Sequence, residues 1–422
     1  MAGTTHRSPP GAARRAPAVP AVRRRRPEVG APGDPAPGAT PSGRAMSGLA
    51  PFLAVGAAID KPLLLWSEPG QGKTAATRQF CAVTERHCET VIASLRDPTD
   101  FGGLPVVLDG AVHLAPPNWA RRAHAAALAG QDVLLFFDEF TTAPPAVQAA
   151  LLRVVDERVV GDLDLRRLPA GAGRVYVLAA ANPEDQAAGG WGLSAPLANR
   201  LIHVTWRPEL ADWLDGMVSG WAPQPPVRVR PDWAAGLPAA RTLVAAYIKT
   251  QPTKRHVLPE DEARRGGPWP SLRTWEYAAY VIAAAGALEL PADRARAVRN
   301  ELLAGTVGDV AAEFARWEQE LDLPDPEALL ADPGALALPR RTDLQYAILT
   351  AVTGAVIGSP ATNTPARWEA CCEVLAKAEE AGNPDIAAVC LGQLARNRPA
   401  GARTPRALER FAQAIAAARI PF

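Results

Sequence analysis

The sequence feature that most constrains the fold is the stretch Pro62–Thr74, which reads PLLLWSEPGQGKT. Its first half is a continuous apolar run, typical of a strand that is buried on both faces of a sheet. The run breaks at Ser-Glu-Pro-Gly, which favours neither helix nor strand. Gly70 and Gly72 allow the backbone to turn its N–H groups inward as an anion cradle. Lys73 can then reach the β- and γ-phosphates of a nucleotide, and Thr74 can offer its hydroxyl to Mg²⁺.

The segment after this loop predicts a helix from Ala75 to Val83, which Thr74 opens. The dipole of such a helix favours a phosphate at its N-terminus. One position departs from the strict phosphate-loop pattern, because Ser67 stands where glycine is usual, six residues before Lys73. Serine is small and compatible with a turn, so we expect weaker geometry and a working site. The alternative is an ordinary strand–turn–helix corner that binds no ligand.

The length of 422 residues and the hydrophobic content of 48% are typical of a soluble globular protein of two or three domains. The formal net charge of +1 hides an asymmetry, because residues 1–45 carry eight Arg and two acids. That tail is therefore +6, and the remainder of the +1 total leaves −5 for the rest of the chain. A body of this charge is not expected to bind nucleic acid.

Residues 1–45 are rich in Pro, Ala, Gly and Arg and have no periodic apolar face, so we expect them to be disordered. The run Arg23–Arg26 could contact nucleic acid or a membrane surface, but we favour a solvated tail, or upstream sequence before a true start at Met46. No apolar segment follows these arginines, which argues against a secretory signal. No run reaches the ~18 apolar residues that span a bilayer. The five Cys have no CxxC spacing, so reduced thiols and a cytoplasmic location are expected.

A second apolar run, Val133–Phe137, ends in the two acids Asp138 and Glu139. A strand of this kind delivers carboxylates to the C-terminal edge of an open α/β sheet, where ligands bind. Asp138 would hold Mg²⁺ through water, and Glu139 would polarise the water that attacks the γ-phosphate. The alternative is a plain strand end.

Three further segments predict strands at residues 89–94, 175–181 and 201–206, with a loop at 96–103. Apolar flanks around Asp109-Gly110 predict a hairpin at 106–114, and a second hairpin is expected at 159–165. The strand at 175–181 ends in Asn182, which could orient water near a γ-phosphate or simply form a turn before Pro183. Helices are expected at 119–128, 145–153 and 208–221.

The second half of the chain has mainly helical signals. A Pro-rich connector at 222–238 leads to helices at about 239–250, 272–288 and 292–305, which we expect to form a compact lid. Residues 306–422 show helical patterns with Pro breaks, at 310–321, 368–380 and 386–394. The apolar and aromatic residues of 310–321 recur at helical spacing, so we interpret them as core and not as a ligand site. No His–Cys cluster indicates zinc.

At this point the residues resemble an AAA+ ATPase, specifically the MoxR-like or dynein-related branch. Glu68–Thr74 is similar to a Walker A motif and Phe137–Glu139 to a Walker B motif. Asn182-Pro183 resembles sensor 1, and Asn199–Leu201 resembles the arginine-finger element. Pro270–Trp275 resembles the sensor 2 segment of the lid.

The resemblance covers about residues 48–300. The segment Glu139–Leu152 is similar to the run DE-x-x-x-A-P-x-x-V-Q-x-A-L-L of that branch, and the two predicted hairpins resemble its two insertions. Spacings of 65, 44, 18 and 73 residues separate Lys73, Asp138, Asn182, Arg200 and Arg273. For Arg200 and Arg273 the alternative is an arginine that caps carbonyls at a helix end.

The resemblance implies an α/β fold: a P-loop NTPase three-layer αβα core with a five-stranded parallel sheet, an α-helical lid and a helical C-terminal region. The expected divisions are a tail (1–45), a nucleotide-binding core (46–207), a connector with lid (208–305) and a helical region (306–422). The implied ligands are ATP and Mg²⁺, with the metal on Thr74 and Asp138. The residues implied to bind nucleotide are Glu68, Pro69, Gly70, Gln71, Gly72, Lys73, Thr74, Ala75 and Arg273, and the catalytic set is Glu139, Asn182 and Arg200.

The same resemblance implies a homo-oligomeric ring, with six subunits in the family pattern, because a finger at the end of the core cannot easily reach its own γ-phosphate. It also implies a chaperone-like role on a protein substrate, often with a von Willebrand factor A-domain partner. Two alternatives stay open: an ATP-gated binding scaffold with little turnover, and a nucleic-acid motor. The charge of −5 outside the tail and the lack of a basic–aromatic stripe argue against the motor.

Overall fold

The computed structural model describes residues 3, 48–183, 186, 190–221, 225–321, 324–358, 361–381, 384–403 and 405. The predicted disordered tail lies outside these residues, apart from Gly3. The described residues from 48 onward belong to one compact unit.

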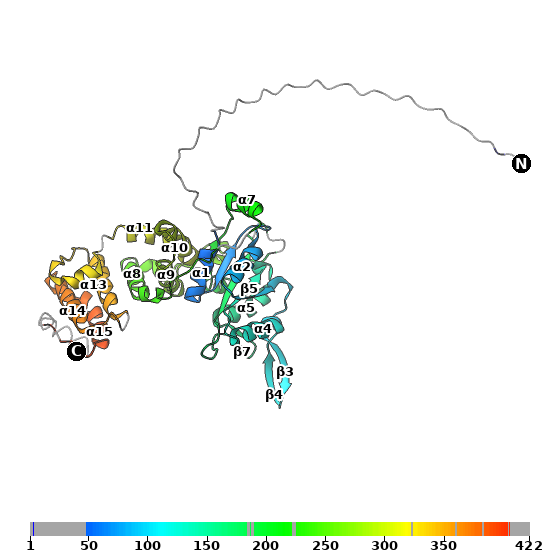
Figure 1. Ribbon diagram of the computed structural model, residues 1–422, viewed down its shortest axis with the longest axis horizontal. Helices are drawn as coiled ribbons and strands as arrows, with labels where there is room; N and C mark the ends of the chain where they lie inside the picture. The colour runs from blue at the N-terminus through cyan, green and yellow to red at the C-terminus, as the bar shows by residue number, and fades with distance from the viewer. Residues whose placement is uncertain are drawn as a thin grey trace, which may run out of the picture. The chain divides into compact units, whose positions relative to one another are not determined.

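The described part of the chain builds a five-stranded sheet in the order β2–β5–β8–β1–β9, with every pair of neighbours parallel. Figure 1 labels β5 of this sheet. The outer strand β2 is partly exposed, whereas β5, β8 and β9 are buried along most of their length. This confirms the predicted parallel sheet. The strands are β1 (Leu63–Trp66), β2 (His87–Ile92), β5 (Val133–Asp138), β8 (Val175–Ala181) and β9 (Ile202–Thr205).

Helices cover both faces of this sheet, which gives the predicted three layers. Side chains alternate between the two faces along each strand, so each face has its own apolar core. One face packs on α4 (Asn118–Leu128) and α5 (Pro145–Glu157). The other packs on α1 (Ala50–Ile59), α2 (Lys73–Val83) and two helices from later in the chain, α9 (Leu272–Ala285) and α10 (Ala292–Val307).

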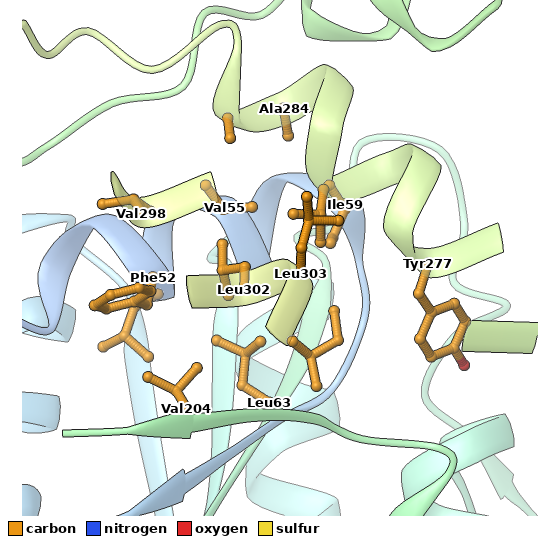
Figure 2. Close-up of a cluster of buried hydrophobic side chains, with 14 of the residues drawn as sticks. Phe52, Val55, Ile59, Leu63, Val204, Tyr277, Ala284, Val298, Leu302 and Leu303 are labelled. Carbon is orange, nitrogen blue, oxygen red and sulfur yellow. The ribbon is translucent and has the colours of Figure 1, made fainter. Parts of the chain in front are cut away.

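Helix α1 was not predicted from the sequence. Figure 2 shows its Phe52, Val55 and Ile59 in one buried cluster with strand residues, such as Leu63, and side chains of α10, such as Leu302. The helix is buried on nearly all sides. A helix in that position needs no polar face, and so its sequence lacks the amphipathic stripe that would reveal it.

Two hairpins leave the core, β3–β4 (Leu104–Leu108 and Ala111–Ala115) and β6–β7 (Val159–Val160 and Leu163–Asp164), as predicted. They meet at two glycines with φ of 89° (Gly103) and 60° (Gly161). A Cβ on Gly161 would lie only 2.3 Å from the Leu114 carbonyl oxygen. The Asp162 amide donates to that same oxygen (2.9 Å), and its carboxylate accepts from the Leu114 amide (2.9 Å). The two hairpins are therefore joined at their bases.

The lid helices pack directly on the sheet. A Cβ on Gly305 of α10 would lie 1.6 Å from the carbonyl oxygen of His203 in β9, so only glycine permits this approach. The expected boundary at residues 207/208 is consequently not a break in packing, because core and lid share one apolar cluster. The other helices of this region are α7 (Leu210–Ser219), α8 (Leu237–Thr250) and α11 (Val310–Gln319).

The C-terminal region has an apolar core of its own, in which Trp368 and Leu391 are buried. It contacts the lid where α13 crosses α8: Lys249 lies 4.2 Å from the centre of the Tyr346 ring. Phe314 of α11 is fully buried, which confirms the interpretation of the 310–321 pattern as core. Among the described helices, none is long and apolar enough to cross a membrane. The helices of this region are α12 (Pro326–Ala331), α13 (Thr342–Ile357), α14 (Pro365–Glu380) and α15 (Pro384–Arg396).

Candidate nucleotide site

The loop between β1 and α2 has the backbone geometry of an anion cradle. Gly70 and Gly72 have φ of 78° and 88°, in the left-handed region that favours glycine. A Cβ at either position would meet no atom within 4 Å, so the loop is open on that side. Helix α2 begins at Lys73, and its first N–H groups have no partner within the helix. Ser67, which replaces the usual glycine, is buried, and its hydroxyl makes no hydrogen bond to a described residue.

The Lys73 ammonium is held by three oxygen acceptors. It donates to the carbonyl oxygens of Ser67 (2.8 Å) and Glu68 (3.1 Å) and to Oδ1 of Asn182 (2.6 Å). The last contact joins residues 109 positions apart, at the ends of the neighbouring strands β1 and β8. Burial lowers the pKa of Lys73, and Asp138 opposes this shift. A set of acceptors around one ammonium is the arrangement that phosphate oxygens can replace.

Thr74 and Asp138 present two hard oxygens next to this cradle. The Thr74 hydroxyl donates to Oδ2 of Asp138 at 2.7 Å. Mg²⁺ takes one or two such protein ligands and completes its shell with water and phosphate oxygens. The described residues hold no group of three or more His, Cys, Asp or Glu that could bind a metal alone, so these two residues fit Mg²⁺ only together with a bound phosphate.

Glu139 lies just beyond the end of β5 with φ of 54°. Its amide donates to Oδ1 of Asp138 (3.0 Å), and its carboxylate accepts a hydrogen bond from the hydroxyl of Ser94. Ser94 belongs to a 3₁₀ turn, Ala93–Leu95, that follows β2. The sequence predicted a strand through Ser94 and assigned it no role. Its position at the C-terminal end of the strand next to β5 was the available signal.

A pocket of about 550 Å³ adjoins the phosphate loop. Its walls are mostly apolar, as is usual for sites that hold an organic ligand. The loop contributes Gly70 and Gly72, and the lid contributes Leu290 and Arg294. The three tryptophans that line it, Trp206, Trp213 and Trp221, were not predicted as site residues.

Arg200 lies at the opposite edge of the sheet from the phosphate loop of its own chain. It precedes β9, whose first residue, Ile202, pairs with Leu63 at the start of β1, whereas the loop follows the last residue of β1. Its guanidinium donates to Oδ2 of Asp156 (2.7 Å) and to the Pro196 carbonyl oxygen (2.8 Å). The structure therefore does not bring Arg200 to its own Lys73.

Arg273 also lies at that opposite edge. The N-cap of α9 is Ser271, whose hydroxyl donates to Oδ1 of Asn199 at 2.8 Å, so the helix starts beside Arg200. Tyr277, one turn later, is close enough to Asp156 and Arg273 for both charges to act on its pKa, which burial raises. The structure thus does not place Arg273 in the nucleotide pocket of its own chain, because the Ser271–Asn199 contact fixes the start of α9 elsewhere.

His203 connects the two edges. The Trp66 indole donates to Nδ1 of His203 (2.9 Å), so Nε2 carries the proton and donates to the Ala198 carbonyl oxygen (3.0 Å). Burial lowers the pKa of His203 to about 4, which keeps the ring neutral. Trp66 directly precedes the phosphate loop and Ala198 lies two residues before Arg200, so one buried ring ties both segments together.

Residues 62–201 match the AAA domain family of the dynein-related subfamily. The matched range runs from the start of β1 past Asn182 to Leu201 and so contains the whole polar cluster. A solved structure described as a "putative ATPase" from Cytophaga hutchinsonii is similar at 15% identity and a TM-score of 0.39, over 65% of this chain and 89% of that one. That similarity is too low to support an inference. No curated protein matches the chain.

Proposed function

We propose that this chain, which carries an AAA domain at residues 62–201, is a MoxR-type AAA+ ATPase that hydrolyses ATP in a ring and remodels a partner protein. One observation carries the proposal. The first two residues of α2 reach the ends of two different strands beside an open glycine cradle: Lys73 donates to Asn182 after β8, and Thr74 donates to Asp138 at the end of β5. A plain strand–turn–helix corner gives no reason for that convergence.

The phosphate loop supports binding of a nucleoside triphosphate. Lys73 would exchange its carbonyl and amide acceptors for phosphate oxygens, which form stronger, charge-assisted hydrogen bonds. The N-terminus of α2 would add its free N–H groups and its dipole. The tryptophan-lined pocket has room for the base and the sugar next to the loop.

The residues around the cradle support hydrolysis. Glu139 would polarise the attacking water as general base, with Ser94 holding its carboxylate in place. Asn182 would release Lys73 and orient the water. Thr74 and Asp138 would hold Mg²⁺, which neutralises charge on the phosphates when bound.

The position of Arg200 supports a ring. An arginine at the far edge of the sheet can complete only the site of a neighbouring copy, and a head-to-tail contact of that kind closes into a ring when the rotation allows. Arg273 shares this edge, so we assign it to the neighbour's site as well. The number six, a protein substrate and a von Willebrand factor A-domain partner rest on the family resemblance alone.

The test is ATP turnover by the purified chain, measured as phosphate release, together with nucleotide affinity. The wild-type chain should hydrolyse ATP, and Glu139→Gln should bind ATP with similar affinity and turn it over at a small fraction of the rate. Tight binding without turnover in the wild type would favour the ATP-gated scaffold. A rate that rises several-fold on adding DNA would favour the nucleic-acid motor. No nucleotide binding at all would refute the proposal.

A further inference from the structure

Two cysteines lie together where the end of α2 packs against β2. Cys81 is in the last turn of α2, and Cys88 is the second residue of β2. Both side chains belong to the same apolar cluster, in which Cys81 is buried and Cys88 is half-buried. The turn between them is closed by a hydrogen bond from the Arg86 amide to the Cys81 carbonyl oxygen (2.8 Å), and the two thiols hydrogen-bond to each other. The fold therefore holds two free thiols in contact.

The two thiols differ in acidity and in access to solvent. The hydrogen bond from Cys81 lowers the pKa of Cys88 against the effect of burial, and the charge of Arg78 acts in the same direction. The Thr90 hydroxyl, which lies 3.9 Å from the Cys88 sulfur, adds to this effect. The same thiol pairing, together with burial, raises the pKa of Cys81, which is only 2% exposed. Cys88 is thus the thiolate that an oxidant can meet, and Cys81 is a protonated thiol next to it, which is the arrangement of a redox-sensing pair.

A second pair of neighbouring cysteines, in the C-terminal region, lacks these features. Cys371 and Cys390 both lie against Thr353, and each is 0% exposed. Burial raises the pKa of both thiols. Neither of them can meet an oxidant as a thiolate, so this pair is a matched control within the same chain.

We propose that Cys88 and Cys81 are a site of reversible oxidation by hydrogen peroxide, which joins α2 to β2 through a disulfide. In the first step the Cys88 thiolate attacks one oxygen of the peroxide and the O–O bond breaks. Cys88 becomes a sulfenic acid, and the hydroxide that leaves takes up a proton to give water. In the second step the Cys81 sulfur gives up its proton and attacks the Cys88 sulfur, so that the S–S bond forms and the S–O bond breaks. The departing hydroxide and that proton form a second water.

The electrons of this reaction balance without a further reactant. The two thiols together lose two electrons, and the peroxide gains them as it becomes two waters. A dithiol reductant returns both cysteines to thiols by exchange through a mixed disulfide.

A disulfide at this place acts on the helix that carries the cradle. The sulfur atoms of a disulfide are about 2 Å apart, closer than those of two hydrogen-bonded thiols, so closing the bond draws the end of α2 and the start of β2 together. Phe80 and Val83, on either side of Cys81, line the nucleotide pocket, and Lys73 begins the same helix. We expect oxidation to displace this wall of the pocket and to weaken ATP binding. The effect on ATP rests on the proposed function, whereas the thiol chemistry does not.

Peptide mapping by mass spectrometry tests the thiol chemistry in the wild-type chain. The reduced protein is treated with a small molar excess of hydrogen peroxide, unfolded in the presence of an alkylating agent and digested. We expect a Cys81–Cys88 disulfide within one chain, which dithiothreitol removes, while Cys371 and Cys390 are recovered as alkylated thiols. If the Cys81–Cys88 disulfide is absent, or if both pairs are oxidised to the same extent, the inference is overturned.

Two variants separate the two steps and the effect on the nucleotide. Cys81→Ala should leave Cys88 as a sulfenic acid that dimedone traps, and Cys88→Ser should give neither product. Calorimetry before and after peroxide should show the Kd of the wild type for ATP rising by at least about 5-fold, the lower end of typical couplings between two sites, with no change for Cys88→Ser. An oxidised wild-type chain with an unchanged Kd overturns the coupling to the site. A reduced wild-type chain that binds no ATP refutes the proposed function instead, and the peptide map alone then decides the thiol chemistry.

Discussion

The two edges of the central sheet use similar polar side chains in opposite ways. At the C-terminal edge Lys73 donates to Asn182 and Thr74 donates to Asp138, beside an open cradle and a pocket. At the N-terminal edge Arg158 is 1% exposed and is satisfied by the chain itself. It donates to the Val175 carbonyl oxygen (3.0 Å) and to Oδ1 of Asp60 (2.8 Å).

This difference separates groups that a ligand can recruit from groups that hold the fold. Burial lowers the pKa of Arg158, and Asp60 opposes this shift. Because the guanidinium is buried and bonded within the chain, a ligand cannot reach it. Arg200, at the same edge, is intermediate: it has an ion pair with Asp156 but stays 20% exposed. A surface arginine of this kind can leave its carboxylate for a stronger anion.

The largest expected effect tests whether Arg200 is one of the groups that a ligand can recruit. Arg200→Ala should bind ATP normally but hydrolyse it roughly 10³- to 10⁵-fold more slowly, because the finger acts on the neighbour's γ-phosphate. Mixing Arg200→Ala with Glu139→Gln should restore part of the activity, since some interfaces then combine an intact Glu139 with an intact Arg200. Fluorescence transfer between labelled subunits must show exchange. If exchange is demonstrated and the mixture shows only background activity, Arg200 does not act on the neighbour's site and belongs with the groups that hold the fold.

The next effect concerns the cradle. Lys73→Ala removes the one cation of the loop and with it the charge-assisted hydrogen bonds that Lys73 would make to phosphate oxygens, which contribute about 1.5–3 kcal/mol each. The Kd for ATP, measured by calorimetry, should rise by at least about 100-fold, while the melting temperature changes little. Unchanged affinity would contradict the assignment of the nucleotide site.

The opposite outcome is expected for Arg158. Arg158→Met should lower the free energy of unfolding by about 1–3 kcal/mol, because it removes the hydrogen bond to the buried Val175 carbonyl oxygen and the ion pair with Asp60, whose side chain is 40% exposed. ATP affinity of the folded fraction should be unchanged. The control is Arg153→Met, an exposed partner of Glu157, for which we expect less than about 0.5 kcal/mol. Denaturant unfolding measures the stability and calorimetry measures the ATP affinity. An Arg158→Met chain that loses ATP affinity but keeps its stability would show that Arg158 serves the ligand site and not the fold.

His203, which links the edges, predicts a smaller effect that depends on pH. Its pKa is lowered from 6.5 to about 4 in the folded chain, so the unfolded chain binds more protons in this interval. The contribution of neutral His203 to the free energy of unfolding is complete above pH 6.5 and is lost as the pH falls toward about 4, a change of about 1–3 kcal/mol. The stability difference between wild type and His203→Gln should therefore shrink from pH 7.5 to 4.5. A difference that stays constant across this range would show that the ring is not held neutral.

The polar cluster at the C-terminal edge could be predicted because each member is marked locally. Lys73 and Thr74 follow a glycine-rich turn, and Asp138 and Asn182 end apolar runs, so the rule that parallel strands place their ends at one edge suffices to bring them together. The five-stranded sheet followed from the same apolar runs. Neither prediction needed the packing of side chains that are distant in the sequence.

What could not be predicted depends on such packing. Helices α1 and α13 are buried on several sides, so they carry no stripe of fixed period. The location of Arg273 depends on one hydrogen bond between Ser271 and Asn199, 72 residues apart. Ser94 and the three tryptophans of the pocket belong to no motif: Ser94 and Trp206 follow strands, whereas Trp213 lies in α7 and Trp221 just after it.

The close approach of Gly103 and Gly161 has a kinematic consequence. The close packing of these glycines and the hydrogen bonds between Leu114 and Asp162 hold the hairpins β3–β4 and β6–β7 together. We therefore expect the two hairpins to move as one body. The joined base of the hairpins directly follows the end of α5, a helix whose start lies six residues after Glu139. We expect a force on the hairpin tip near Asp109 to reach the residues around the cradle through this joint and α5. We expect any side chain larger than glycine at position 161 to separate the bases of the two hairpins, while the tip at Asp109 and the cradle keep their structures.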